Sequence, residues 1–159
     1  MVNSETAQLI DITLDAESIG RSSRVVEHER QVAILDLLES NQFALTDHEG
    51  GPYKLRLSMI ESRLSFGVSD ASGNILRVFM LSLGPFRKIV KDYFMMCDSY
   101  REAIRNLPPR QIEAIDMGRR GVHDEGGRIL MDRLEGKITI NFDTARRLFT
   151  LICALHWRG

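Results

Sequence analysis

Apolar and polar residues alternate in five short stretches of this chain, and the alternation predicts five β-strands. The stretches are residues 10–14, 53–59, 64–68, 76–80 and 138–142. In each of them every second side chain is apolar, so one face of the strand should be buried. Short turns at residues 60–62 and 70–74 separate the three central stretches, which predicts an antiparallel meander. Residues 41–52 contain Gly50, Gly51 and Pro52 and are expected to form a surface loop.

Four further segments carry apolar residues at intervals of three and four, which predicts four α-helices. Their expected extents are residues 25–39, 85–107, 110–135 and 143–155. Ser22 or Ser23 can cap the first helix, and Asp143 is the expected N-cap of the last. Proline is tolerated in a first helical turn, so Pro108-Pro109 should end the second helix and open the third. The predicted element order is therefore β-α-β-β-β-α-α-β-α.

The third predicted helix carries opposite charges along one side. Its charged residues at intervals of four are Asp116, Arg120, Asp124, Arg128 and Asp132. Pairs with this spacing stabilise a helix, and apolar residues project to the opposite side, so a continuous helix over residues 110–135 is expected. Its four glycines each destabilise a helix by about 1 kcal/mol, which leaves open an alternative with two helices broken near Gly121. Gly118 and Gly126 lie on the apolar side and allow close approach of another backbone.

The last predicted helix is apolar around most of its circumference between residues 148 and 155. One sheet face covers only one side of a helix, so this helix should lie in the core or at a self-association interface. The candidate interface residues are Phe149, Ile152, Leu155 and Trp157.

The composition is that of one folded domain. The 159 residues are 43% hydrophobic and 27% charged, which is typical of a single globular core. We therefore expect one α+β domain over residues 1–159, with an antiparallel β-meander and outer strands packed against about four helices. Cys97 and Cys153 fall in apolar helical segments and are expected to be buried thiols in a reducing cytoplasm. The pattern of the chain predicts neither an export signal nor a membrane span.

The charge balance bears on the choice of partner. The 21 basic and 22 acidic side chains nearly cancel, so no general attraction to nucleic acid or to anionic lipid is expected. A local basic patch of Arg87, Lys91 and Arg105 on the second helix is the place where nucleic-acid binding would be tested. This function ranks third among those considered.

The common catalytic and ligand-binding motifs are absent from the sequence. There is no Walker loop, no dinucleotide GxGxxG after a strand, no GxSxG, and no CxxC or HExxH spacing, so neither a metal nor a cofactor is expected. Arg119 and His123 break the pattern, because they project one turn apart into the apolar side of the third helix. Polar groups in such a place need partners. The expected partner is a structural carboxylate such as Glu27 or Glu29, a group of backbone carbonyls, or a bound anion.

His28 and Arg147 complete the set of candidate anion-binding residues. His28 falls on the side of the first helix that is expected to face the core, and Arg147 lies in the first turns of the last helix, where backbone N–H groups attract anions. A packed or ion-paired structural role is the alternative for all four residues, and base rates favour it.

Several long segments resemble the motifs of a bacterial uncharacterised protein family. They are IDITL at 10–14, VEHER at 26–30, PFRKIVKDY at 85–93, IEAIDMGRRG at 112–121, DTARRLFTLIC at 143–153 and HWRG at 156–159. The resemblance covers nearly the whole chain. It implies a bacterial cytoplasmic protein, and it carries no activity, substrate or catalytic residue over to this chain.

The sequence therefore leaves two classes of function open. The excess of apolar helical surface favours a non-catalytic interaction or regulatory protein that forms a homodimer. The alternative is an enzyme or a binding protein for a small phosphorylated or carboxylate ligand, built from Arg119, His123, His28 and Arg147. A concave pocket containing two of these residues would favour the alternative.

Overall fold

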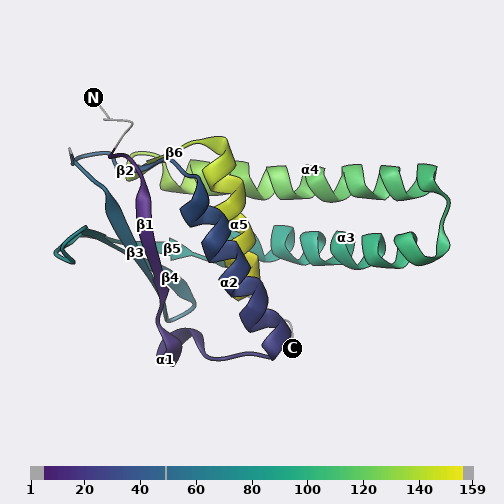
Figure 1. The fold of residues 1–159 in the computed structure, drawn as a ribbon, viewed down its shortest axis with the longest axis horizontal. Helices are drawn as coiled ribbons and strands as arrows, with labels where there is room; N and C mark the ends of the chain where they lie inside the picture. Colours follow the sequence, from purple (N-terminus) through teal and green to yellow (C-terminus); the bar gives the residue numbers. More distant parts are fainter. Residues whose placement is uncertain (1–5, 49, 156–159) are drawn as a thin grey trace.

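A mixed four-stranded sheet and a long helical hairpin determine the shape of the molecule (Figure 1). The computed structural model describes residues 6–48 and 50–155. Its elements, in chain order, are β1 (Leu9–Leu14), α1 (Ala16–Ile19), α2 (Arg24–Glu39), β2 (Phe43–Leu45), β3 (Tyr53–Ile60), β4 (Arg63–Asp70), β5 (Ile75–Ser82), a 3-10 turn (Gly84–Phe86), α3 (Arg87–Asn106), α4 (Pro109–Leu134), β6 (Ile138–Ile140) and α5 (Phe142–Leu155). The α+β class is confirmed.

The sheet is the predicted meander with one added edge strand. Its order is β1-β3-β4-β5, in which β3, β4 and β5 are antiparallel and β1 is parallel to β3. Leu57 lies opposite Phe66, and both side chains are fully buried on the face that carries the core. Glu61 and Ser62 connect β3 to β4 with φ angles of 47° and 64°, the left-handed pair that a tight hairpin turn requires.

The first strand buries a different set of residues from the predicted one. Ile10 was expected to face the core, but its side chain is 42% exposed, whereas Leu9 and Ile12 are buried. The pairing with β3 shifts register between Leu9 and Asp11. An extra residue at this bulge moves the following side chains to the other face, which a strict period of two does not anticipate.

The predicted loop over residues 41–52 begins with a strand. Phe43–Leu45 is fully buried and pairs antiparallel with Ile138–Ile140, so these two strands form a separate two-stranded sheet. The Asn41 side chain fixes the approach to this strand, because it donates to the carbonyl oxygens of Leu37 and Leu9 and accepts from the Leu9 N–H. Three residues are too few for an alternation to stand out in the sequence.

Helices α2 and α5 lie side by side and antiparallel against the sheet (Figure 1). The expectation that the last helix lies in the core is confirmed, because most of its residues between Thr144 and Ala154 are buried. Its N-cap differs from the predicted Asp143. The Asn141 side chain accepts from the Thr144 N–H at 2.9 Å, and Asp143 lies in the first turn.

Helices α3 and α4 form an antiparallel hairpin whose outer half projects beyond the rest of the molecule, and we call this hairpin the arm (Figure 1). The predicted continuity of the third helix is confirmed, because α4 runs unbroken through its four glycines. At Gly126 a methyl group would overlap the ring of Phe149 on α5, so close helix approach is the reason for glycine there. Among the described residues, no helix has both the length and the apolar character needed to cross a membrane.

Candidate functional site

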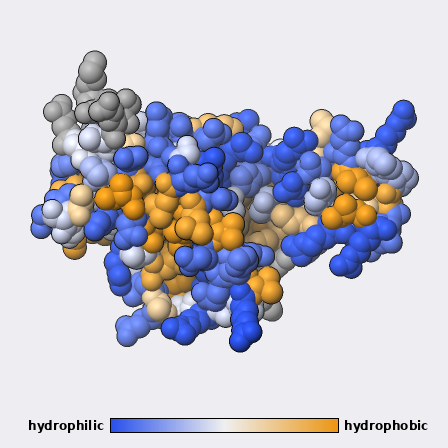
Figure 2. Space-filling view, viewed as in Figure 1, coloured by the Kyte–Doolittle hydropathy of each residue, from blue (hydrophilic) through white to orange (hydrophobic). Residues whose placement is uncertain are grey.

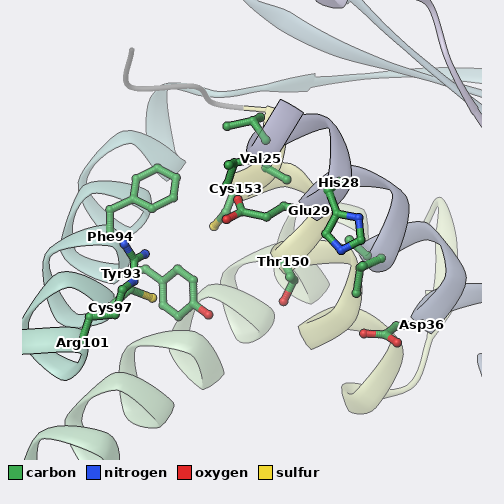
Figure 3. Close-up of a pocket in the computed structure, with 14 residues that line it drawn as sticks. Val25, His28, Glu29, Asp36, Tyr93, Phe94, Cys97, Arg101, Thr150 and Cys153 are labelled. Carbon is green, nitrogen blue, oxygen red and sulfur yellow. The ribbon is translucent and has the colours of Figure 1, made fainter. Parts of the chain in front are cut away.

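A groove of about 550 Å³ lies between α2 and α3, with α5 as its floor (Figure 3). Its apolar walls are Val25 and Val32 on α2 and Phe94 on α3, and Cys153 and Ala154 form part of the floor. The volume lies in the range of about 300 to 1,000 Å³ that is usual for binding sites. The groove therefore has the size and the apolar lining of a place where another molecule binds.

Polar groups enter the groove from all three helices. Glu29 and His28 project from α2, the Tyr93 hydroxyl and Arg101 from α3, and the Thr150 hydroxyl from α5 (Figure 3). Arg101 is already paired, at 3.5 Å, with Asp98 on the same helix. The rim is thus charged and the interior apolar, the usual organisation of a protein-binding surface.

Three rings pack together behind the groove, at the base of the arm. The centroid of the His123 ring lies 5.2 Å from that of Tyr93 and 5.7 Å from that of Phe149, and the Tyr93 and Phe149 centroids are 5.9 Å apart. His123 Nε2 also lies 2.6 Å from the hydroxyl oxygen of Thr150. The Thr150 hydroxyl donates to the carbonyl of Arg146 at 3.2 Å, so it accepts from the imidazole N–H. His123 is therefore assigned as neutral with its proton on Nε2.

Burial sets the protonation states around the groove. It lowers the pKa of His123 from 6.5 to about 4, and the positive charge of Arg146 acts in the same direction. Burial also raises the pKa of the Tyr93 hydroxyl and of the Cys153 thiol above their ordinary values. All three groups are uncharged at neutral pH, the opposite of what an activated nucleophile needs.

The structure gives Arg119 a protein carboxylate as its partner. Its guanidinium donates from Nε at 3.1 Å and from Nη2 at 2.6 Å to one oxygen of Asp116, and it lies over the ring of Tyr100 at 4.9 Å. The prediction that Glu27 or Glu29 is the partner is wrong, because Arg119 pairs with Asp116 one turn away on its own helix. Glu27 pairs instead with Arg30 on α2. A cation already neutralised by an adjacent carboxylate attracts an added anion weakly.

The four candidate anion-binding residues do not meet in one pocket. His28 lines the groove and is exposed, whereas Arg119 and His123 lie on α4 outside its lining. Arg147 donates to the carbonyl oxygen of Ser40, just beyond the C-terminal end of α2. The basic positions Arg87, Lys91 and Arg105 are all exposed on α3.

The candidate interface residues fall mainly in the core. Phe149 and Ile152 are fully buried within the single chain, so they are not on a surface, and Leu155 is half-buried. The physical reason is that α5 is covered by α2, by α4 and by the sheet at once. Trp157 lies outside the described residues.

Sequence reasoning missed the residues that build the groove. Tyr93 and Cys97, the latter expected to be a buried thiol, line the groove from α3, and Thr150 lines it from α5. Tyr93 and Cys97 are four residues apart, and this spacing marks them in the sequence as part of one side of α3. That this side is only partly covered depends on where α2 is placed, which the spacing does not contain.

Comparison with known proteins places the chain among bacterial sequences of one family. The model of the Uncharacterised protein family (UPF0262) matches residues 6–158. A UPF0262 protein of Rhizobium meliloti (strain 1021) is 60% identical over 152 residues, which cover 96% of each chain. A UPF0262 protein of Brucella canis is 58% identical over 154 residues, again 96% of each chain. No solved structure matches this chain significantly.

Proposed function

The chain belongs to the Uncharacterised protein family (UPF0262), and we propose that it is a non-catalytic interaction protein of the bacterial cytoplasm that acts as a homodimer. The observation that carries the proposal is an apolar surface left uncovered on one face of the molecule. This surface consists of the groove, the adjoining side of α2, and the outer half of the arm. Exposed apolar patches of this kind mark interaction sites in soluble proteins.

The α2 side of this surface has the spacing of a helix-packing seam. Val25, Val32 and Leu35 are 68%, 41% and 57% exposed, and they follow one another at intervals of seven and three. Residues with this spacing form one stripe along a helix. Figure 2 shows the apolar surface over α2 in the centre of this face.

The arm carries the second part of the surface. Ile104, Leu107 and Met117 are exposed on its outer half, where the rest of the molecule does not cover it. Figure 2 shows apolar surface near the end of the arm, on the same face as the apolar surface over α2. The projecting part of the arm buries little apolar surface within one chain and would bury more if a second copy packed against it. This supports an assembly of two copies.

The protonation states favour binding over catalysis. Tyr93 and Cys153 keep their protons at neutral pH, and His123 has donated its only N–H to Thr150. The anion-binding alternative receives less support, because Asp116 neutralises Arg119 and the other candidates lie elsewhere.

The mass of the protein in solution tests the proposal. Light scattering coupled to size-exclusion chromatography should give twice the mass of the chain at micromolar concentration. Val32→Asp should give the monomer mass, because a charge would be buried in the seam. Val78→Asp is the matched control, because it makes the same substitution at an exposed valine on β5, and it should remain dimeric. A wild-type protein that is monomeric throughout would overturn the proposed function.

A further inference from the structure

We infer that the two copies exchange their arms, so that the end of the α3–α4 arm of one copy lies on the α2–α3 groove of the other. The inference rests on the proposed homodimer and specifies its geometry. It also assigns a role to the outer half of the arm, which projects beyond the rest of its own chain.

The placement of the two apolar areas is compatible with two-fold symmetry. The two apolar areas lie on the same face of the molecule, one over α2 and one near the end of the arm (Figure 2). A two-fold axis that lies in the plane of that face, midway between the areas and across the arm, brings the faces together. It also places the arm end of each copy over the α2 area of the other. Two complementary patches on one face are what an isologous dimer of this kind requires.

The direction of α3 also supports the exchange. Tyr93, Cys97 and Arg101 line the groove and follow one another at intervals of four on one side of this helix. Ile104 is the next residue on that side, and it is 54% exposed because α2 does not extend so far. The wall of the groove therefore continues past the Asp98-paired Arg101 to the exposed apolar side chain of Ile104 on the arm. A partner that lies antiparallel along this side of α3 reaches the groove with its own Ile104.

The charges of the two areas are complementary on the α2 side of the groove. The α2 rim of the groove carries the carboxylates of Glu29 and Asp36. The arm end carries Arg105 and Arg110 on either side of Leu107, and all three side chains are exposed. The nearby Glu102 carboxylate accepts a hydrogen bond from the Asn106 amide on its own helix. The arm end thus offers apolar side chains flanked by cations to a groove whose α2 rim carries anions and whose α3 rim carries Arg101, already paired with Asp98.

Complementation between two variants tests the exchange. Val32→Asp damages the groove and leaves the arm end intact, whereas Ile104→Asp damages the arm end and leaves the groove intact. Each variant alone should be monomeric, and an equimolar mixture should form heterodimers, because one undamaged contact remains in each. Both positions are exposed in the single chain, so both variants should keep the wild-type circular dichroism spectrum.

Other arrangements give different results. If the two grooves pack together, Ile104→Asp stays dimeric, and if the two arm ends pack together, Val32→Asp stays dimeric. Either result, or a mixture that stays monomeric, overturns the exchange. A wild-type dimer in any of these cases leaves the proposed function standing, so the two failures can be told apart.

Charge reversal is a second test that does not place a charge in an apolar contact. Arg105→Glu and Glu29→Arg should each raise the dimer dissociation constant about fivefold to tenfold, and the chain carrying both changes should return to within about twofold of wild type. Arg87→Glu, at the base of the same helix, is the matched control and should leave the constant unchanged. A double variant weaker than either single variant would contradict the assigned pairing of arm end and groove.

Discussion

The imidazole of His123 donates to the hydroxyl of Thr150 across 2.6 Å and so joins α4, at the base of the arm, to α5, the floor of the groove. The same ring packs on Tyr93 of α3. One side chain therefore connects the three helices whose relative positions shape the groove. Protonation of His123 should therefore weaken the contacts among these three helices.

Stability should fall when the pH drops below the unfolded pKa of His123. The folded pKa is lowered from 6.5 to about 4, so between these values the unfolded chain binds a proton that the folded chain does not. Stability from this group is complete above pH 6.5 and decreases down to about pH 4. The ring is partly exposed, so we expect a loss of about 1 to 2 kcal/mol, less than the full linkage value.

Urea unfolding at several pH values measures this effect. His123→Gln should remove much of the pH dependence between 4 and 6.5, whereas His28→Gln on the exposed side of α2 should retain it. Parallel stability curves for wild type and His123→Gln would show that another group causes the dependence.

Gly126→Ala should destabilise the protein although alanine is the better helix former. The added methyl group would overlap the Phe149 ring, which is fully buried and has no room to move. Overpacking of this kind costs about 1 to 3 kcal/mol and outweighs the gain of about 1 kcal/mol in helix propensity. Gly121→Ala is the control, since no heavy atom lies within 4 Å of its added methyl group, and it should stabilise. Equal stability changes in denaturant titrations would refute the packing explanation.

The buried Arg30 on α2 should contribute strongly to the stability of the fold. Its buried guanidinium donates to the carbonyl oxygens of Ala154 and Gly20 at 3.0 and 2.9 Å, and it pairs with Glu27. Arg30→Met leaves these acceptors without a donor and should lower the unfolding free energy by about 2 to 4 kcal/mol.

The control for this change is Arg24→Met on the exposed start of the same helix, which should alter stability by less than about 0.5 kcal/mol. Thermal or urea unfolding compares the two variants. A near-wild-type Arg30→Met would mean that water replaces the lost donor.

Arg119 should behave as a structural residue. Because Asp116 neutralises it, Arg119→Met should cost about 1 kcal/mol, and inorganic phosphate should not raise the melting temperature of the wild type. A phosphate-dependent rise that disappears in Arg119→Met would instead establish an anion site.

The long elements could be predicted because their pattern repeats. The unbroken α4 followed from a charge series over residues 116–132 and an apolar side opposite it, and the meander followed from three alternating stretches separated by tight turns. Within the charge series, Asp116 does pair with Arg120 at 3.3 Å. Asp124, however, pairs at 2.8 Å with Arg146 on α5. A partner from another helix replaces the neighbour that spacing alone suggests.

The short and the composite features were decided by tertiary structure. The bulge that exposes Ile10 and the buried strand Phe43–Leu45 depend on pairing with distant strands. The groove depends on the distance between α2 and α3, with α5 between them as its floor. Phe149 is buried because three elements cover α5 together. A sequence period records which side of an element is apolar. Whether that side is covered by the same chain or left for a partner depends on the position of every other element, because burial is a property of the packed whole.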